Sequence, residues 1–287
     1  MGEGLVTAEL GPGAGHRRPV RKRFGQHFLE PNWVRKVVAA IGPRPGELFL
    51  EIGPGRGQLT TPLAAAGSRV VAIEIDRDLA GDLRQAAGVG VTVVTGNVLD
   101  EDVLALLESV SGSGESMRVA GNLPYSLSSP ILFRLLELQR ACGRFSDATL
   151  MLQREVAERV AGRPGTRAYG PLAILCELSA DASVVLRLPP GAFRPPPRVD
   201  SALVRLSFRP PPVEIADLGL FSDMVRALFS QRRKTLANAL RPFAASLTDV
   251  APRRLLEAAR LEADVRAETL DLRSLSRLAD AIGAERR

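Results

Sequence analysis

The 287-residue sequence predicts an α/β fold, with a Rossmann-like sheet over most of its length and a small all-α domain at its C-terminal end. Short apolar strand patterns alternate with helical patterns up to about residue 209. The first strong strand runs directly into a glycine-rich turn, which is typical of a nucleotide-binding βα unit. After Arg209-Pro210-Pro211-Pro212 the strand patterns stop, and helical patterns continue to the end.

We expect three divisions of the chain. Residues 1–19 are rich in glycine and alanine and are expected to form a disordered N-terminal tail. Residues 20–209 carry all the strand patterns and are expected to form a Rossmann-like catalytic domain. Residues 210–287 carry only helical patterns and are expected to form the small C-terminal domain.

The first elements follow from apolar spacing and from glycine. A helical pattern begins at Pro31 and ends near Ile41. An apolar strand at residues 48–52 comes next, and the turn after it contains Gly53 and Gly55. Glycine lets the backbone approach a ligand closely, and the helix after the turn offers free N–H groups at its start. We therefore expect this turn to hold part of a nucleotide cofactor.

The second strand, residues 69–76, contains two acidic side chains near its end. Glu74 lies 21 positions after Gly53, where a carboxylate accepts hydrogen bonds from both ribose hydroxyls of a cofactor. Asp76 is placed to cap a helix at residues 77–86. Dehydrogenases share this geometry, so these elements alone leave NAD and S-adenosylmethionine equally open.

Two further strands bring polar side chains to the same edge of the predicted sheet. Asn97 follows a strand at residues 91–95, from where its side chain can hydrogen-bond the adenine of the cofactor. Asn122 follows a strand at residues 117–121. Because open α/β sheets bind ligands at the carboxyl ends of their strands, these side chains point to one site.

The tetrapeptide Asn122-Leu123-Pro124-Tyr125 suits methyl transfer to an exocyclic nucleobase amine. The lone pair of such an amine is delocalised into the ring. The Asn122 oxygen and a main-chain carbonyl beside Pro124 can accept both N–H hydrogens and localise that lone pair. Tyr125 can stack on a flipped-out base. By itself, the tetrapeptide fits equally well a strand that ends in a turn.

The later part of the sheet region is expected to contain a helix at residues 130–139, a strand at 148–152 and a helix from about Arg154. We interpret residues 161–170 as an exposed loop near an RNA path, or equally as a simple turn between helices. Phe193 precedes three prolines, which favour a rigid loop that holds its ring over the target base. The alternative is a connector whose Phe193 covers the edge of the core. A strand at residues 201–208 follows.

Composition favours an intracellular nucleic-acid enzyme, because the net charge is +6 and Lys and Arg gather in several short clusters. Each single cluster also fits a solvated surface. The two cysteines predict reduced thiols. The two histidines and two cysteines show no metal-ligand spacing, so we expect no metal. There is no apolar run long enough for a membrane span and no apolar segment of a secretory signal, so we expect a cytoplasmic protein. We separately expect a monomer, although nothing in the sequence tests the oligomeric state.

In combination, these motifs resemble the ribosomal RNA adenine dimethyltransferase family, in particular the bacterial enzymes that dimethylate two adjacent adenosines near the 3′ end of 16S rRNA. The resemblance covers nearly everything after about residue 20. It rests on six segments: residues 21–29, 51–57, Glu74, 122–125, 193–201 and 230–236. It implies S-adenosylmethionine as the cofactor, 16S rRNA in the small ribosomal subunit as the partner, and a C-terminal domain that grips rRNA. The sequence alone equally permits a packing lid there.

The resemblance also implies roles for single residues. The residues that it places against S-adenosylmethionine are His27, Leu29, Gly53, Gly55, Glu74, Ile75, Asn97 and Asn122. Those that it places around the target base are Asn122, Leu123, Pro124, Tyr125 and Phe193. The family often has Asn at the place of His27 and usually has Asp at the place of Asn97. Imidazole and carboxamide both keep a hydrogen-bonding atom, so both changes are compatible with the role. His27 also fits a partly buried polar residue.

Three other functions remain open at this point. A 23S rRNA adenine methyltransferase of the macrolide-resistance type shares the fold and most motifs; Leu123 and residues 125–130 favour the small-subunit enzyme. A ribosome-assembly factor without catalysis would keep the fold, but the intact Glu74 and the tetrapeptide argue against it. An NAD dehydrogenase is the weakest alternative, because nothing in this sequence supplies the chemistry of hydride transfer.

Overall fold

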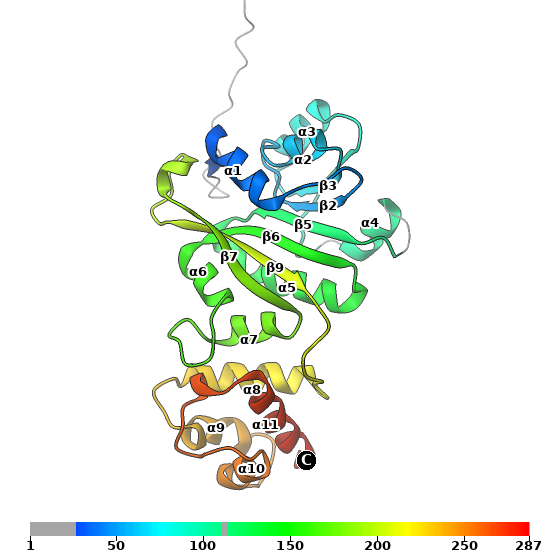
Figure 1. Cartoon of the computed structure of the whole chain (residues 1–287). Helices are drawn as coiled ribbons and strands as arrows, with labels where there is room; N and C mark the ends of the chain where they lie inside the picture. The colour runs from blue at the N-terminus through cyan, green and yellow to red at the C-terminus, as the bar shows by residue number, and fades with distance from the viewer. Residues whose placement is uncertain (1–26, 101, 111–113, 287) are drawn as a thin grey trace, which may run out of the picture.

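The computed structural model describes residues 27–100, 102–110 and 114–286 (Figure 1). The expected tail at residues 1–19 and the basic cluster Arg21-Lys22-Arg23 lie outside these residues. A seven-stranded sheet forms the centre of the molecule. Across the sheet its strands are β4 (Val91–Thr95), β3 (Arg69–Glu74), β2 (Leu48–Ile52), β5 (Met117–Asn122), β6 (Phe145–Gln153), β9 (Ser201–Phe208) and β7 (Ala180–Leu188).

The sheet is parallel from β4 to β6 and antiparallel from there to β7. The strand at residues 91–95 occupies its predicted residues, and Asp76 caps the next helix as predicted, because its carboxylate accepts from the N–H groups of Asp78 and Leu79. The predicted Rossmann-like α/β fold is therefore confirmed. The edge strand β7 was not predicted.

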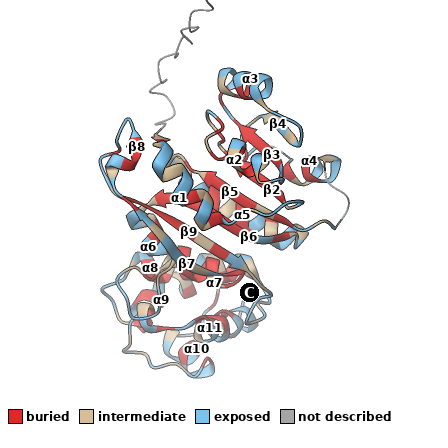
Figure 2. Ribbon diagram, turned by 45° about the horizontal axis from the view of Figure 1, so that its top comes forward, coloured by how far each residue is buried: buried red, intermediate tan, exposed pale blue. Residues whose placement is uncertain are grey.

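Helices cover both faces of the sheet, as central strands that are buried on both faces require. Leu48, Leu50 and Ile52 of β2 face one layer, and Phe49 faces the other. Figure 2 shows β2 and β5 buried almost throughout. The helices of the first layer are α4 (Val103–Val110), α5 (Ser128–Cys142), α6 (Arg154–Val160) and α7 (Pro171–Glu177). Those of the second are α1 (Pro31–Ile41), α2 (Thr60–Ala65) and α3 (Arg77–Ala86).

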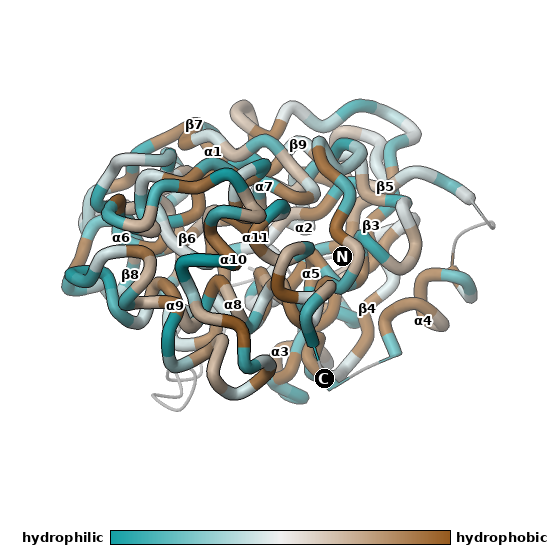
Figure 3. The backbone as a smooth tube through the Cα atoms, turned by 90° about the horizontal axis from the view of Figure 1, so that it is seen from below, coloured by the Kyte–Doolittle hydropathy of each residue, from teal (hydrophilic) through white to brown (hydrophobic). Residues whose placement is uncertain are grey.

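The C-terminal part of the chain forms four helices below the sheet, and α8 lies against α7 (Figure 1). Seen from below, apolar and polar segments alternate along these helices (Figure 3). The buried side of α8 includes Phe221, Met224 and Leu228, as the helical spacing of its apolar residues requires. The helices are α8 (Leu218–Ser230), α9 (Leu236–Ala245), α10 (Pro252–Ala258) and α11 (Leu272–Ala284).

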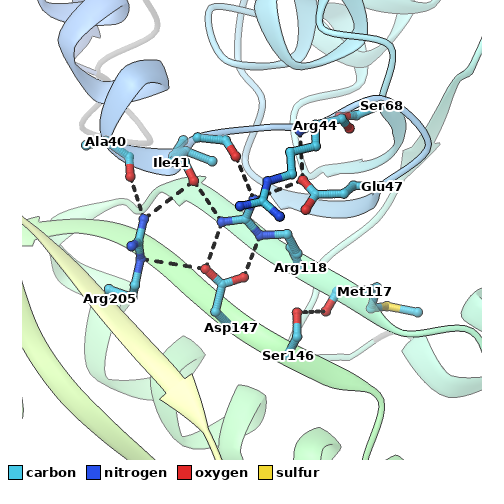
Figure 4. Close-up of polar contacts among 11 residues, drawn as sticks. Ala40, Ile41, Arg44, Glu47, Ser68, Met117, Arg118, Ser146, Asp147 and Arg205 are labelled. Carbon is cyan, nitrogen blue, oxygen red and sulfur yellow. Dashed lines mark hydrogen bonds and ion pairs between the residues drawn. The ribbon is translucent and has the colours of Figure 1, made fainter.

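A charged network fixes the C-terminal end of α1 to the amino ends of β5 and β6 (Figure 4). Arg118 donates to both carboxylate oxygens of Asp147, at 2.7 and 2.9 Å, and to Glu47 at 2.9 Å. Its remaining bonds go to the carbonyls of Ile41 and Gly42. These carbonyls have no partner within α1, so a cation there satisfies them and stabilises the end of the helix.

Candidate functional site

A cavity of about 310 Å³ opens at the carboxyl ends of β2, β3 and β5, where the sequence motifs converge. This volume falls within the range of small-molecule sites. Its lining is largely apolar and, among the described residues, contains no Lys or Arg. The lining residues are His27, Phe28, Leu29, Glu51, Gly53, Pro54, Gly55, Gln58, Leu59, Glu74, Ile75, Asn122, Leu123, Pro124, Tyr125, Ser126 and Leu127.

The turn after β2 is built from three glycines with positive φ, at residues 53, 55 and 57. L side chains rarely adopt this backbone conformation. A Cβ atom on Gly57 would also lie 2.7 Å from Leu83 Cδ1. The turn thus brings backbone to the cavity wall, and the N–H of Gly55 donates to the carboxylate of Glu74 at 2.9 Å.

Glu74 ends β3 and holds a nearly buried carboxylate at the cavity wall, where it is 3% exposed. One oxygen accepts from the N–H of Gly55 and the other from the N–H of Asp76, each at 2.9 Å. Burial raises the pKa of Glu74, although these two bonds act in the opposite direction. Each oxygen keeps a lone pair that can accept from a ribose hydroxyl. The next residue, Ile75, is 40% exposed and presents an apolar surface to the cavity.

Asn122 ends β5, and the first described residue of the chain fixes its amide. Its Nδ2 donates to the carbonyl of His27 at 2.9 Å, so Oδ1 is the atom left to accept from a ligand. The carbonyl of Pro124 already accepts from the N–H of Leu127 and the hydroxyl of Ser128. Among the described residues, no N–H donates to the carbonyl of Leu123. Asn122 Oδ1 and the Leu123 carbonyl are therefore two acceptors at the cavity that no described donor engages.

Tyr125 is held on two sides. Its hydroxyl lies 2.5 Å from Ser201 Oγ, and its ring stacks on the ring of His27 with centroids 5.5 Å apart and planes at 26°. His27 Nδ1 in turn lies 2.7 Å from the carbonyl of Pro195. The proline segment thus sets the position of His27, and His27 sets that of Tyr125.

The structure does not bring Phe193 to the cavity, contrary to the expectation that its ring covers the target base. Phe193 is 1% exposed and packs in the core beneath α1. The cause is a two-stranded antiparallel pair of β1 (Phe28–Leu29) with β8 (Phe193–Arg194), in which Leu29 lies opposite Phe193. This burial corresponds to the alternative, in which Phe193 covers the edge of the core.

Asn97 also lies outside the lining of the cavity. Its Nδ2 donates to Asp100 Oδ2 at 2.7 Å, and its Oδ1 accepts from the N–H of Leu99 at 3.2 Å. Both polar ends of its amide are thus engaged within the turn that follows β4.

Seven lining residues were not among the predicted site residues, and two of these, Gln58 and Glu51, make informative contacts. Gln58 exchanges hydrogen bonds with the backbone of Leu29, one of them 2.8 Å long, and so joins β1 to the glycine turn. Glu51 is 1% exposed, and its Oε2 has no hydrogen-bond partner among the described residues. The signal for Glu51 was a single acidic residue inside the apolar strand at residues 48–52.

A second cavity, of about 560 Å³, lies where the loop at residues 161–170 meets α6, α7 and the end of α8. Arg159, Arg167 and Arg232 line it, together with Glu155 and Glu158. The loop that the sequence placed near an RNA path thus borders a hollow with three guanidinium groups.

Within the described parts of the chain, no three His, Cys, Asp or Glu side chains are grouped as metal ligands. Among the same residues, every helix is too short or too polar to cross a bilayer.

Comparison with known proteins places this geometry among RNA-modifying enzymes. A sequence profile described as ribosomal RNA adenine dimethylase matches residues 17–277. A protein of Xanthomonas oryzae pv. oryzae (strain PXO99A), named ribosomal RNA small subunit methyltransferase A, is 42% identical over 264 residues. The match covers 91% of this chain and 96% of that protein. A protein of the same name from Xanthomonas campestris pv. campestris (strain 8004) matches with the same identity and coverage.

Two solved structures are similar over most of the chain. A dimethyladenosine transferase from Plasmodium falciparum superposes with a TM-score of 0.71 at 24% identity, covering 88% of this chain and 96% of that one. The 23S rRNA methyltransferase ErmE superposes with a TM-score of 0.64 at 25% identity, covering 89% of this chain and 99% of that one. The first of these likenesses supports the fold alone.

Proposed function

Because the chain belongs to the ribosomal RNA adenine dimethylase family, we propose that it is an S-adenosylmethionine-dependent enzyme that dimethylates N6 of two adjacent adenosines. The proposed site is the 3′-terminal hairpin of 16S rRNA within the small ribosomal subunit, so the reaction is a step of ribosome biogenesis. The observation that carries the proposal is a pair of acceptors, Asn122 Oδ1 and the Leu123 carbonyl, that no described donor engages, beside a cavity with buried carboxylates.

The residues of the cavity fit S-adenosylmethionine. Glu74 has lone pairs for the two ribose hydroxyls, and Ile75 offers an apolar surface to the adenine. Among the residues that the structure describes, the lining carries acidic groups and no Lys or Arg, which suits a cofactor with a net positive charge. When bound, the cofactor supplies an electrophilic methyl group on its sulfonium.

The chain's own residues would activate the amine by position and hydrogen bonding. Asn122 Oδ1 and the Leu123 carbonyl accept the two amine hydrogens, which turns the nitrogen lone pair toward the methyl group. Tyr125, held by Ser201 and His27, offers its ring to the target base. No covalent intermediate, metal or strong base is required. The nitrogen becomes acidic after the transfer and loses its proton to water, and a second round methylates the same atom.

Basic side chains support the RNA part of the proposal. Arg159, Arg167 and Arg232 border the second cavity, where loop 161–170 meets the C-terminal helices. Guanidinium groups bind phosphate and contribute affinity that salt weakens. We propose that this side of the molecule and the C-terminal helices grip the rRNA.

The 23S rRNA methyltransferase is the second candidate, because ErmE shares the fold over most of both chains. The identity decides between them: 42% to the small-subunit enzymes against 25% to ErmE. An assembly role without catalysis is not favoured, since both amine acceptors are in place. An NAD dehydrogenase is excluded by family membership.

Incubation with labelled S-adenosylmethionine tests the proposal. The substrates are small ribosomal subunits that lack the two methylated adenosines and, in parallel, protein-free 23S rRNA, with the product mapped by mass spectrometry. Dimethyladenosine confined to the 3′-terminal hairpin of 16S rRNA is expected. Methylation of 23S rRNA alone would move the assignment to the resistance type, and cofactor binding without transfer to either RNA would support an assembly factor.

The proposal includes action in the cytoplasm as a monomer without a metal. Light scattering coupled to size-exclusion chromatography tests the monomer, and unchanged methylation after dialysis against a chelator tests the absence of a metal requirement.

A further inference from the structure

Ser201 is a buried hydroxyl residue at the edge of the sheet where the candidate site lies. It is the first residue of β9 and is 1% exposed. Because β9 runs antiparallel to β6, this first residue lies opposite Gln153, the last residue of β6, and thus at the edge that carries Asn122. Ser201 is not among the described residues that line the cavity. Its hydroxyl reaches the site through Tyr125, whose hydroxyl lies 2.5 Å away.

The backbone around Ser201 is held from several directions. In the sheet, Ser201 lies between Gln153 of β6 and Leu188 of β7. The preceding residue, Asp200, is bound twice by Arg154: its carbonyl accepts from the N–H at 2.9 Å, and its carboxylate accepts from Nη1 at 2.7 Å. A side chain on such a rigid element has a well-defined position. The Ser201 hydroxyl is therefore a fixed anchor.

Tyr125 has fewer restraints than its anchor. It lies in a single 3₁₀ turn, Tyr125–Leu127, and its side chain lines the cavity. Among the described residues, Ser201 provides the only hydrogen bond to its hydroxyl. The ring also stacks on His27, whose own ring is held by one hydrogen bond to the carbonyl of Pro195. The bond to Ser201 is thus the contact that connects the ring of Tyr125 to the sheet.

The two hydroxyls are suited to positioning and not to proton transfer. Burial raises the pKa of Tyr125 above its ordinary value, although the bond with Ser201 acts in the opposite direction. The phenol therefore stays protonated at neutral pH, and an aliphatic hydroxyl does not ionise there either. A neutral pair of this kind has no base to offer to the amine of the substrate, but it restrains the ring.

We propose that Ser201 is a positioning residue for methyl transfer, whose hydroxyl fixes the ring of Tyr125 in the orientation on which the target adenine stacks. The inference rests on the proposed function and adds to it a residue outside the cavity. A base stacked on a fixed ring keeps its amine within reach of Asn122 Oδ1, whereas a ring that turns lets the base occupy unproductive positions. Loss of the bond therefore lowers kcat and changes KM little, because phosphate contacts elsewhere supply most of the affinity for RNA.

A double-mutant cycle tests this role. Initial rates of methyl transfer to small ribosomal subunits that lack the two methylated adenosines are measured for wild type, Ser201→Ala, Tyr125→Phe and the double variant. Each single substitution is expected to lower kcat about tenfold, as the loss of one hydrogen bond implies, and to leave KM within about twofold. The double variant is expected to lose no more than the weaker single variant, because both substitutions break the same bond.

Three further measurements separate positioning from a purely structural role. The affinity of Ser201→Ala for S-adenosylmethionine in titration calorimetry should stay within about twofold of wild type. Ser201→Thr keeps the hydroxyl on a residue that suits a strand and should recover most of kcat. Ser68→Ala is the matched control: Ser68 is 4% exposed and donates to the carbonyl of Arg44 at 3.0 Å, at the amino end of the sheet. This control should keep the kcat of wild type.

The same measurements can overturn the inference. A wild-type kcat in Ser201→Ala would do so, as would losses that multiply to about a hundredfold in the double variant. A fall in cofactor affinity as large as the fall in kcat would assign Ser201 to the fold alone. A changed shape of the pH profile of kcat in Tyr125→Phe would assign the hydroxyls to proton transfer and also overturn it. Wild-type protein that methylates neither RNA would refute the proposed function itself and, with it, this inference.

Discussion

The amino and carboxyl ends of the central sheet both hold charged side chains. Those at the amino end are partly buried and paired within the chain, whereas the acidic groups at the carboxyl end are buried beside a cavity. At the amino end, Arg118 finds two carboxylates, Asp147 and Glu47, and two helix carbonyls (Figure 4). At the carboxyl end, Glu51 and Glu74 are 1% and 3% exposed, and the part of the cavity lining that the structure describes contains no Lys or Arg. The ion pairs at the amino end stabilise the fold, whereas the acidic groups at the carboxyl end are available to a ligand.

This difference indicates how to separate stability from function in such a sheet. A buried charge whose partners all lie within the chain contributes to folding, and removing it leaves those partners unsatisfied. A buried acid without a partner costs stability and is retained for another reason. Substitutions at the two ends should therefore move different observables.

The largest expected effect is at the carboxyl end. Asn122→Ala removes one of the two proposed acceptors for the amine and should lower turnover by about 10²- to 10³-fold. The melting temperature should remain close to that of wild type, since the amide gives up only its bond to the His27 carbonyl. Initial rates of methyl transfer to undermethylated small subunits measure the loss. Turnover within a factor of two of wild type would contradict the assigned role.

At the amino end, Arg118→Ala should instead lower stability and leave the chemistry intact. The substitution removes the guanidinium that donates to Asp147, to Glu47 and to the last carbonyls of α1. We expect the free energy of unfolding to fall by about 3 kcal/mol. Urea denaturation followed by circular dichroism measures it. If the variant keeps the stability of wild type and loses only turnover, the assignment of the amino end to stability and the carboxyl end to function is wrong.

The cofactor-free protein should show the cost of the unpaired acid directly. The pKa of Glu51 is raised from 4.5 to about 7, so the folded state binds more protons than the unfolded state between these values. This group's stabilising contribution is full below pH 4.5 and is lost as the pH rises, by up to about 3 kcal/mol at pH 7 and above.

Glu51→Gln removes this titration. The variant should therefore be more stable than wild type at pH 8 and similar to it at pH 4, in urea denaturation without cofactor. Curves of stability against pH that run parallel for the two proteins would show that Glu51 is already satisfied.

The smallest effect is expected at an exposed pair away from both ends. Arg226 and Asp223 lie 3.6 Å apart on α8, with side chains 61% and 66% exposed. Arg226→Ala should change the free energy of unfolding by less than about 0.5 kcal/mol, because exposed ion pairs are screened. It is the matched control for Arg118→Ala in the same urea titrations. A loss as large as that of Arg118→Ala would show that pairing alone, without burial, decides the cost.

The parallel half of the sheet could be predicted because its elements carry local signals. The strand at residues 91–95 and the cap at Asp76 lie where the sequence put them. Strand β7 was missed because it is a half-exposed edge with an irregularity between Val184 and Leu186, which breaks the alternation of a strand. Partners distant in sequence set its position.

The site divides in the same way. Gly53 follows β2, and Glu74 and Asn122 end β3 and β5, so the topology alone brings them to one edge. Phe193 depends on a pairing with Leu29 that no local pattern encodes, and this pairing turns its ring into the core. Glu51 Oε2 lacks a hydrogen-bond partner among the described residues, and a sequence does not reveal that.

The pairing of β1 with β8 has a consequence for synthesis of the chain on the ribosome. Strands β2 to β6 are complete once residue 153 has been made, so the parallel half of the sheet can form early. The segment from His27 to Leu29, which lines the cavity, is held by the pairing of Leu29 with Phe193 and by the contact of His27 with the carbonyl of Pro195. Residues 193 and 195 are made about forty residues later. A nascent chain is thus unable to complete its cofactor site until most of the sheet has left the exit tunnel.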